Sequence, residues 1–495
     1  MDIYGSYEIG AVFGGGNGKD PYTLDNGTTW ATNPGANVNG NANTMLYGGL
    51  IHEAFGGSNE KGRITGNVSI NTDPQGTCTL DVGTIYGAGK NADIDGDLIV
   101  TLGCMPENKK TDAVYGGAEN ANVKGNVELT ITSGKFGKVF GGNNQSGAIF
   151  GSITLNIMES GCSPIEIDEL YLGGNQAAYS VYGYYKAIRY ENGGNYYLDA
   201  SHKTPLYVDG SNLYLDENKE KRLYPQNETV GTETITYLYL DEECTKPFYM
   251  PRTSASDSNA AVFFGIPSTD EDHTKPNTTT GQYADPVLNI VSATKIGKVF
   301  GGGLGLGAAL YGNPTVNINQ AYPLEWAGYS EGVTTYQKKD ETFGAIGGGY
   351  KDENNQDVEG GIFGGGNEAA VYGNTTLNIG TKTTVDWKVL VLDNDKKPIL
   401  DDNGKFRTQT LTGQTYNTVI GANIAGNVYG GGNLADVTGS TEVNICAKYN
   451  TTSEKWEGVT LETVGVSIAG NVYGGGKGVA RESGARAFFC EEAMV

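Results

Sequence analysis

The sequence has little of several residue types, and each shortage excludes a class of protein. It is 495 residues long and contains 15 Pro, so it is neither a collagen nor a Pro-rich linker. Its three His lie far apart, which argues against a His-ligated metal site. The six Cys show no CxxC spacing, which excludes a zinc ribbon and a dense disulfide scaffold. These cysteines are Cys78, Cys104, Cys162, Cys244, Cys446 and Cys490.

Basic residues and long apolar runs are also scarce. Lys and Arg total 34 against 57 Asp and Glu, which gives a net charge of −23. A chain this acidic repels phosphate backbones, so we expect no nucleic-acid partner. No apolar run approaches the roughly 20 residues that span a bilayer. The first residues, MDIYGSYEIG, lack a basic and an apolar signal region, which fits a cytoplasmic protein or a fragment of a longer exported one.

Glycine and tyrosine, in contrast, are abundant, and many of them belong to a repeat. The chain has 76 Gly and 31 Tyr. A β-branched or small residue, an aromatic residue and two or three Gly recur as one phrase, for example NVYGGGN at Tyr429. Eleven copies occur, two of them imperfect, and such repetition has to be interpreted before any local pattern. They are centred on Phe13, Phe55, Tyr86, Tyr115, Phe140, Tyr171, Phe300, Ile346, Phe363, Tyr429 and Tyr473.

Each good copy continues with another Gly ten to twelve residues later and then a short alternating run. In NVELTI, Val127, Leu129 and Ile131 share one face, which is the period of a half-buried strand. One unit therefore holds three short strands joined by Gly-rich corners. We predict an all-β fold whose units form about ten coils of a β-solenoid, with the aromatic rings at equivalent places in its interior. Phosphate binding by the GGG phrase is disfavoured, because no Lys-Ser/Thr and no helix follow it.

The alternation of VYGGGN corners with GNTTLNI strands resembles bacterial right-handed parallel β-helix repeat proteins, the kind found in surface adhesins and autotransporter passengers. The resemblance covers about residues 1–182, 286–380 and 416–480. It implies a right-handed parallel β-helix, an extracellular or cell-surface location, and a chain that continues into further solenoid or anchor domains.

Insertions divide the predicted solenoid into segments. We expect N-terminal coils over residues 1–182, central coils over 286–380, and C-terminal coils over 416–495 that are cut from a longer solenoid. Residues 183–285 form a Tyr-rich β-module with a long loop, in which PLYVDGSNLYLDE is a hairpin signal. A second hairpin-like insertion covers 381–415, and a third and shorter one covers 321–342.

One polar column recurs on the side of the strands predicted to face outward. We expect stacked coils to align it as a ladder of side-chain hydrogen bonds that joins the coils, with ice or polysaccharide binding as the weaker alternative. The column consists of Asn71, Thr101, Thr130, Asn156, Asn289, Asn317, Asn378 and Asn444.

Carboxylates on this fold could serve two kinds of chemistry. Asp93, Asp95 and Asp97 resemble a calcium loop, but the Gly falls one place too early for an EF-hand, so a corner of a coil is favoured. A polysaccharide lyase or glycoside hydrolase on this fold needs clustered carboxylates, and none stands at matched repeat positions. We therefore expect no cofactor, no metal and no catalytic residue, and keep a carbohydrate-active enzyme as the alternative function.

The Tyr-rich insertion is the best binding candidate, because Tyr offers a flat apolar ring with a polar tip. The opposing interpretation is that these rings form the core of the module. We predict a structural or adhesive surface protein that binds a glycan or a protein on a cell surface through this insertion. The candidate residues are Tyr184, Tyr185, Tyr190, Tyr196, Tyr197, Tyr207, Tyr214, Tyr237 and Tyr239.

Overall fold

The computed structural model divides the chain into two compact units. Unit 1 comprises Met1–Val181 and Tyr283–Val495, and unit 2 comprises Tyr182–Gln282. Within these bounds the structure describes residues 2–3, 7–18, 22–24, 29–31, 36–72, 79–160, 163–219, 221–242, 244, 247–254, 263–264, 284–395, 399, 401, 407–459, 464–478 and 493–494.

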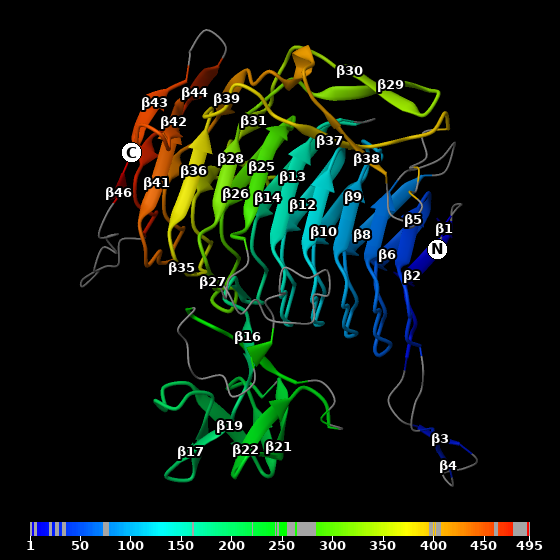
Figure 1. Ribbon diagram of the computed structural model, residues 1–495, viewed down its shortest axis with the longest axis vertical. Coiled ribbons are helices and arrows are strands. Elements are labelled where there is room, and N and C mark those ends of the chain that lie inside the picture. The colour runs from blue at the N-terminus through cyan, green and yellow to red at the C-terminus, as the bar shows by residue number, and fades with distance from the viewer. Residues whose placement is uncertain are drawn as a thin grey trace. The chain divides into compact units, whose positions relative to one another are not determined.

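Unit 1 is built on two long parallel sheets, whose strands run side by side in Figure 1. The eleven-stranded sheet has the order β1 (Asp2–Ile3), β5 (Ala42–Leu46), β7 (Val68–Thr72), β9 (Leu98–Leu102), β11 (Val127–Ile131), β13 (Ile153–Met158), β25 (Val287–Ser292), β28 (Thr315–Ile318), β36 (Thr375–Ile379), β41 (Thr441–Ile445) and β46 (Ala493–Met494). The thirteen-stranded sheet contains β2 (Glu8–Phe13), β6 (Gly49–Phe55), β8 (Leu80–Tyr86), β10 (Lys110–Tyr115), β12 (Gly134–Phe140), β14 (Ile165–Tyr171), β26 (Lys295–Phe300), β31 (Ala345–Ile346), β34 (Gly361–Phe363), β39 (Gly421–Ile424), β40 (Val428–Tyr429), β44 (Gly465–Ile468) and β45 (Val472–Tyr473).

A third, shorter parallel ladder follows the Gly-rich corner of each repeat. It begins as single bridges, of which Val38 to Ile64 and Ile64 to Ile94 are the first. It continues as β15 (Tyr179–Ser180), β27 (Leu310–Tyr311) and β35 (Val371–Tyr372). In the repeats that the structure describes in full, the chain thus visits two long ladders and one short ladder. This arrangement with long parallel sheets confirms the predicted all-β class and is consistent with a β-solenoid.

The alternation read from the sequence decides which side chains face the interior. Val127, Leu129 and Ile131 of β11 are buried, while Glu128 between them is partly exposed. Pairing of β11 with β13 is in register, so Leu129 lies opposite Leu155. Because parallel strands lie about 4.8 Å apart, equivalent side chains of successive repeats touch each other and form continuous interior rows.

The aromatic residues of the repeated phrase form one continuous stack. Neighbouring rings have centroids 4.5–5.0 Å apart and are nearly parallel, with interplanar angles of at most 11°. This confirms that the rings occupy equivalent places in successive repeats. The stack contains Phe13, Phe55, Tyr86, Tyr115, Phe140, Tyr171, Phe300, Phe363, Tyr429 and Tyr473.

The Gly that follows each ring is required by close approach between repeats. A Cβ on Gly87 would overlap the carbonyl oxygen of Gly116, and a Cβ on Gly116 would overlap that of Gly141. Neither residue has a positive φ. Of the two reasons that the sequence offers for corner glycines, close packing therefore applies at these positions.

One of the eleven predicted copies is not a separate repeat. Ile346 in AIGGGYK pairs with Ile296, near the start of β26, and with Ile424 of β39. It does not join the aromatic stack, which continues from the end of β26. The following segment makes a small hairpin, β32 (Tyr350–Lys351) with β33 (Asp357–Val358), before Phe363 resumes the stack. The prediction of an extra copy was wrong because an excursion inside one strand carries its own glycines.

From Thr130 to Asn444 the predicted Asn and Thr column forms the expected ladder, whereas the buried Asn71 amide has no hydrogen-bond partner among the described residues. Each amide from Asn289 to Asn444 donates from Nδ2 to Oδ1 of the preceding Asn, at 2.9–3.0 Å. At the other end, Asn156 Nδ2 donates to Thr130 Oγ1 at 3.5 Å. The expected outward exposure was wrong for several members, since Asn71, Asn156 and Thr101 are buried. Each lies between its equivalents in adjacent strands, and inserted segments contact the same sheet.

Inserted hairpins extend from the repeats. They are β3 (Tyr22–Leu24) with β4 (Thr29–Ala31), β29 (Leu324–Ser330) with β30 (Val333–Lys338), β37 (Trp387–Leu390) with β38 (Thr408–Leu411), and β42 (Ala447–Asn450) with β43 (Lys455–Gly458). The helix η2 (Thr415–Asn417) follows β38.

The β37–β38 segment contacts repeats far from it in sequence. Trp387 is fully buried in a cluster with Met158 and Leu324. Lys388 Nζ lies 2.8 Å from Glu128 Oε1, and Leu390 packs against Met45 and Tyr47. An insertion near residue 390 is thus attached to repeats that begin near residue 45.

Candidate functional site

Unit 2 contains the candidate binding residues, and its chain path follows from its turns. Six strands form one antiparallel meander, because glycines with positive φ stand at Gly193, Gly194, Gly210 and Gly231, between paired strands. These strands are β17 (Tyr190–Asn192), β18 (Asn195–Tyr197), β19 (Pro205–Asp209), β20 (Asn212–Tyr214), β21 (Arg222–Val230) and β22 (Glu233–Tyr239). A second sheet has the order β23 (Tyr249–Pro251), β16 (Tyr184–Lys186) and β24 (Phe263–Phe264).

Leucines form the interior of unit 2. Leu206 lies on the same strand face as its cross-strand partner Tyr196, and Leu213 on the same face as Leu223. We call this the leucine face. Its buried cluster consists of Ala187, Leu198, Leu206, Leu213, Leu223 and Leu238. Leucines therefore make up most of this cluster, and Tyr196 packs against it.

Tyrosines alternate with these leucines and lie on the opposite face of the meander. Three cross-strand pairs join them, one in each hairpin: Tyr190 with Tyr197, Tyr207 with Tyr214, and Tyr224 with Tyr239. Directly opposed residues in an antiparallel pair have Cβ atoms about 5 Å apart. We call the side chains of these three pairs the tyrosine face.

The structure separates the predicted tyrosines by burial. Tyr184, Tyr237 and Tyr239 are buried, with relative exposures of 2%, 1% and 4%. The other six are half-buried, so part of each ring or hydroxyl is accessible; they are Tyr185, Tyr190, Tyr196, Tyr197, Tyr207 and Tyr214. Of these six, Tyr190, Tyr197, Tyr207 and Tyr214 belong to the tyrosine face.

The buried tyrosines hold a lysine. Lys186 Nζ lies 4.2 Å from the ring centroid of Tyr237 and 4.6 Å from that of Tyr239, and 2.5 Å from Glu228 Oε1. Tyr239 also donates its hydroxyl to Glu228. Burial raises the pKa of both phenols, so they stay protonated. Burial also acts to raise the pKa of Glu228, but Lys186 and Tyr239 outweigh it and lower that pKa. Lys186, Glu228 and Tyr239 therefore bind one another and are not available to a ligand.

Unit 2 contains a motif, present three times, that sequence reasoning missed. Tyr-Leu-Asp occurs at 197–199, 214–216 and 239–241, and each copy is followed by a second aromatic strand at Tyr207, Tyr224 and Tyr249. The three aspartates begin equivalent turns, with a positive φ three residues later at His202, Lys219 and Cys244. In each turn the aspartate carbonyl accepts a hydrogen bond from that residue's N–H. The repeated Tyr-Leu-Asp can be found in the sequence, but the more frequent Gly repeat drew attention away from it.

The three aspartates considered for calcium have other partners. Asp93 Oδ1 accepts from Asn122 N at 2.9 Å, and Asp97 Oδ1 accepts from Asn126 N at 2.8 Å. Asp95 Oδ2 lies 2.5 Å from Arg63 Nη2 and Oδ1 lies 3.0 Å from Lys124 Nζ. All three therefore join one repeat to a neighbouring one. Among the described residues, no group of three or more His, Cys, Asp and Glu has the arrangement of a metal site.

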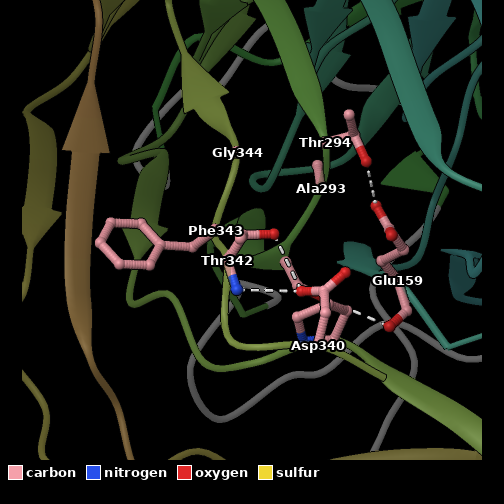
Figure 2. A pocket seen from close by; sticks show the side chains of 9 residues that line it. Glu159, Ala293, Thr294, Asp340, Thr342, Phe343 and Gly344 are labelled. Atoms are coloured by element: carbon pink, nitrogen blue, oxygen red, sulfur yellow. Dashed lines mark hydrogen bonds between the residues drawn. The ribbon is translucent and has the colours of Figure 1, made fainter. Parts of the chain in front are cut away.

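Two carboxylates line a pocket of unit 1, which Figure 2 shows from close by. Glu159 is buried and accepts from Thr294 Oγ1 at 2.9 Å and from Ile165 N at 3.1 Å, with Lys339 Nζ 3.1 Å away. Asp340 Oδ1 accepts from the N–H and the hydroxyl of Thr342. The pocket volume of about 80 Å³ equals two or three water molecules. Internal bonds occupy these carboxylates in a space too small for a sugar ring.

Comparison with known proteins assigns no family to the chain. Neither the protein-family models, nor the curated proteins, nor the solved structures give a match. In the described part of the chain no helix has the length and apolar character to cross a membrane.

Proposed function

We propose that this chain is a segment of a right-handed parallel β-helix of about ten coils that lies outside the cell or on its surface. In this proposal the β-helix is a rigid support, and unit 2 binds a glycan or a protein through its tyrosine face.

The support for the architecture is the register. Strand pairs such as β11 with β13 and β28 with β36 are parallel and in step, and one ring per repeat joins a single stack. The support for the location is chemical. Cys104 forms a disulfide, and such bonds persist in oxidising compartments outside the cytosol. The resemblance to surface β-helix proteins points to the same location.

The observation that carries the binding function is the separation of leucines from tyrosines in unit 2. Because leucines fill the interior, the half-buried rings of Tyr207 and Tyr214 are not needed to close the core. Rings with an accessible face bind sugars and proteins well, since few rotatable bonds are ordered on binding. Connecting segments on a rigid scaffold are also where binding is usually located.

We further propose that the chain acts without catalysis. Glu159 and Asp340 share a pocket, but both are engaged by internal hydrogen bonds. We expect purified protein to release neither reducing ends nor unsaturated products from acidic or neutral polysaccharides, with or without calcium. Measurable release that disappears in Asp340→Asn would favour the enzyme alternative.

The binding proposal is tested by removing unit 2. A chain lacking residues 182–282, with a short Gly-Ser link, should keep the β-rich circular dichroism of unit 1 and lose binding on a glycan array and to cells. A double variant, Tyr207→Ala with Tyr214→Ala, should lose binding while its melting temperature stays close to that of the parent. The matched control is Tyr329→Ala, a half-buried tyrosine of β29 in unit 1. Unchanged binding by the deletion would refute the role of unit 2.

A further inference from the structure

An arginine lies beside the tyrosine face and stacks on one of its rings. Arg222 opens β21, and its guanidinium carbon lies 4.6 Å from the ring centroid of Tyr224. It stands directly opposite Tyr214 on β20, so the order across three strands is Tyr207, Tyr214 and Arg222. Because neighbouring strands are about 4.8 Å apart, this row covers roughly 10 Å of surface.

The charge of Arg222 is not neutralised within the described chain. Its residue surface is exposed, and no carboxylate among the described residues lies within ion-pair distance of it. Two lysines of unit 2 differ in this respect: Lys186 pairs with Glu228, and Lys219 pairs with Asp209 at 3.3 Å. An arginine stacked on a ring and without an acidic partner among the described residues is available to an external anion.

The geometry suits a particular anion. A guanidinium stacked on a ring presents its N–H groups at its edges, which match a carboxylate with two parallel hydrogen bonds. The stacking on Tyr224 restricts the arginine before any ligand binds, which lowers the entropy lost on binding. Beside it, Tyr214 and Tyr207 offer ring surface suited to the apolar C–H face of a sugar.

We propose that Tyr207, Tyr214 and Arg222 form a subsite for a carboxylate-bearing sugar unit, with the sugar ring on the tyrosines and its carboxylate on Arg222. This inference rests on the proposed function and specifies its ligand class. The acidic chain repels a polyanion at long range, so the attraction has to be local. Binding should therefore require both ring contact and the bidentate charge contact.

The experiment uses the full chain and two matched polymers, polygalacturonate and its carboxyl-reduced form. The parent protein should bind the acidic polymer about tenfold more tightly than the neutral one, which is the contribution of one good charge-assisted contact. Arg222→Gln should remove that difference and leave the affinity for the reduced polymer unchanged. Arg222→Lys should restore only part of it, because an ammonium cannot make the planar two-point contact.

The control is Arg189→Gln, because Arg189 also stacks on a tyrosine, Tyr196, at 4.4 Å but lies outside the tyrosine face. It should keep the preference for the acidic polymer. The double variant Tyr207→Ala with Tyr214→Ala should weaken binding of both polymers. Melting temperatures of all variants establish that they are folded.

Several outcomes would overturn the subsite. They are equal affinity of the parent for the two polymers, no binding of either one, and a preference that survives Arg222→Gln. The proposed function can be judged separately, since glycan-array binding that is lost with residues 182–282 but is confined to neutral sugars would support unit 2 as the binding module and reject the acidic subsite.

Discussion

Tyrosine has opposite roles in the two units. In unit 1, Tyr115 and Tyr171 are buried within a stack of rings that passes from repeat to repeat. In unit 2, Tyr207 and Tyr214 face away from a core of leucines and remain partly accessible. The side chain is the same, and its place is decided by the alternation of the strand and by the residue type on the other face. Abundance of tyrosine alone therefore does not identify a binding surface.

The largest expected effect comes from placing a charge in the stack. Tyr115→Asp buries a carboxylate between the rings of Tyr86 and Phe140, which lie at centroid distances of 4.9 and 5.0 Å from Tyr115. Destabilisation by more than about 4 kcal/mol is expected, measured by urea unfolding. The same change on the tyrosine face of unit 2, Tyr207→Asp, should lower the free energy of unfolding by less than about 1 kcal/mol. Equal costs at the two positions would contradict the distinction between the units.

The next effect concerns a buried charge network of unit 1. Glu169 accepts from the hydroxyls of Tyr171 and Tyr350, both at 2.8 Å, and from Lys298 Nζ at 3.1 Å. Burial acts to raise the pKa of Glu169, but these partners outweigh it and lower the pKa. A lowered carboxyl pKa stabilises the fold at neutral pH, and this contribution is lost as the pH falls through the folded-state value.

Glu169→Gln should therefore cost about 3 kcal/mol at pH 7, because it leaves Lys298 largely buried without its partner. The cost should shrink when unfolding is measured below pH 4, the approximate ordinary pKa of Glu. The exposed pair of Glu341 with Lys338 is the control, and Glu341→Gln should leave the free energy of unfolding nearly unchanged. A cost independent of pH would rule out the ionised network.

A smaller effect tests the leucine core of unit 2. Leu213→Ala should destabilise unit 2 by about 2–3 kcal/mol through the cavity it leaves. Calorimetry and limited proteolysis should show unit 2 opening earlier while the transition of unit 1 stays in place. Val208, the cross-strand partner of Leu213, is 48% exposed, so Val208→Ala should change little. Loss of both transitions would show that the units fold as one.

The smallest effect is a gain in stability. Glu119 is buried beside the stack, and burial raises its pKa, since Lys90 at 3.7 Å offsets only part of the desolvation. A raised carboxyl pKa means that the fold loses stability as the pH rises through it. Glu119→Gln should therefore stabilise the chain by up to about 1 kcal/mol at pH 8. The gain should fade near pH 4, and the exposed Glu107→Gln should show none. A constant gain across this pH range would rule out the charge as its cause.

Much of unit 1 could be predicted because the same residue pattern occurs in each of its repeats. The rings at Phe55 and Tyr86 and the amides at Asn317 and Asn378 recur at fixed offsets, and parallel in-register pairing then aligns them. The erroneous copy at Ile346 shows the limit of this reasoning. Its glycines match the phrase, but pairing with Ile296 places it in another row.

Less of the candidate site could be predicted. The density of tyrosine and the Asp-Gly turn indicated a β-module, and the hairpin of Tyr207 with Tyr214 follows from them. The sequence pattern does not distinguish Tyr237, which is buried against Lys186, from Tyr207, which is partly accessible. Both stand in alternating strands, and only the packing of β16 beside β22 decides which is covered.

The sequence by itself determined the all-β character, the repeat length, the stack of rings and the amide ladder, because each depends on local alternation and repetition. Tertiary structure alone decided that Trp387 and Leu390 attach a late insertion to early repeats, and that Arg222 rests on Tyr224 beside Tyr214. The physical reason is that these contacts join segments with no shared period. Their free energy comes from burial and from charge stacking on rings, which act through space and leave no regular pattern along the chain.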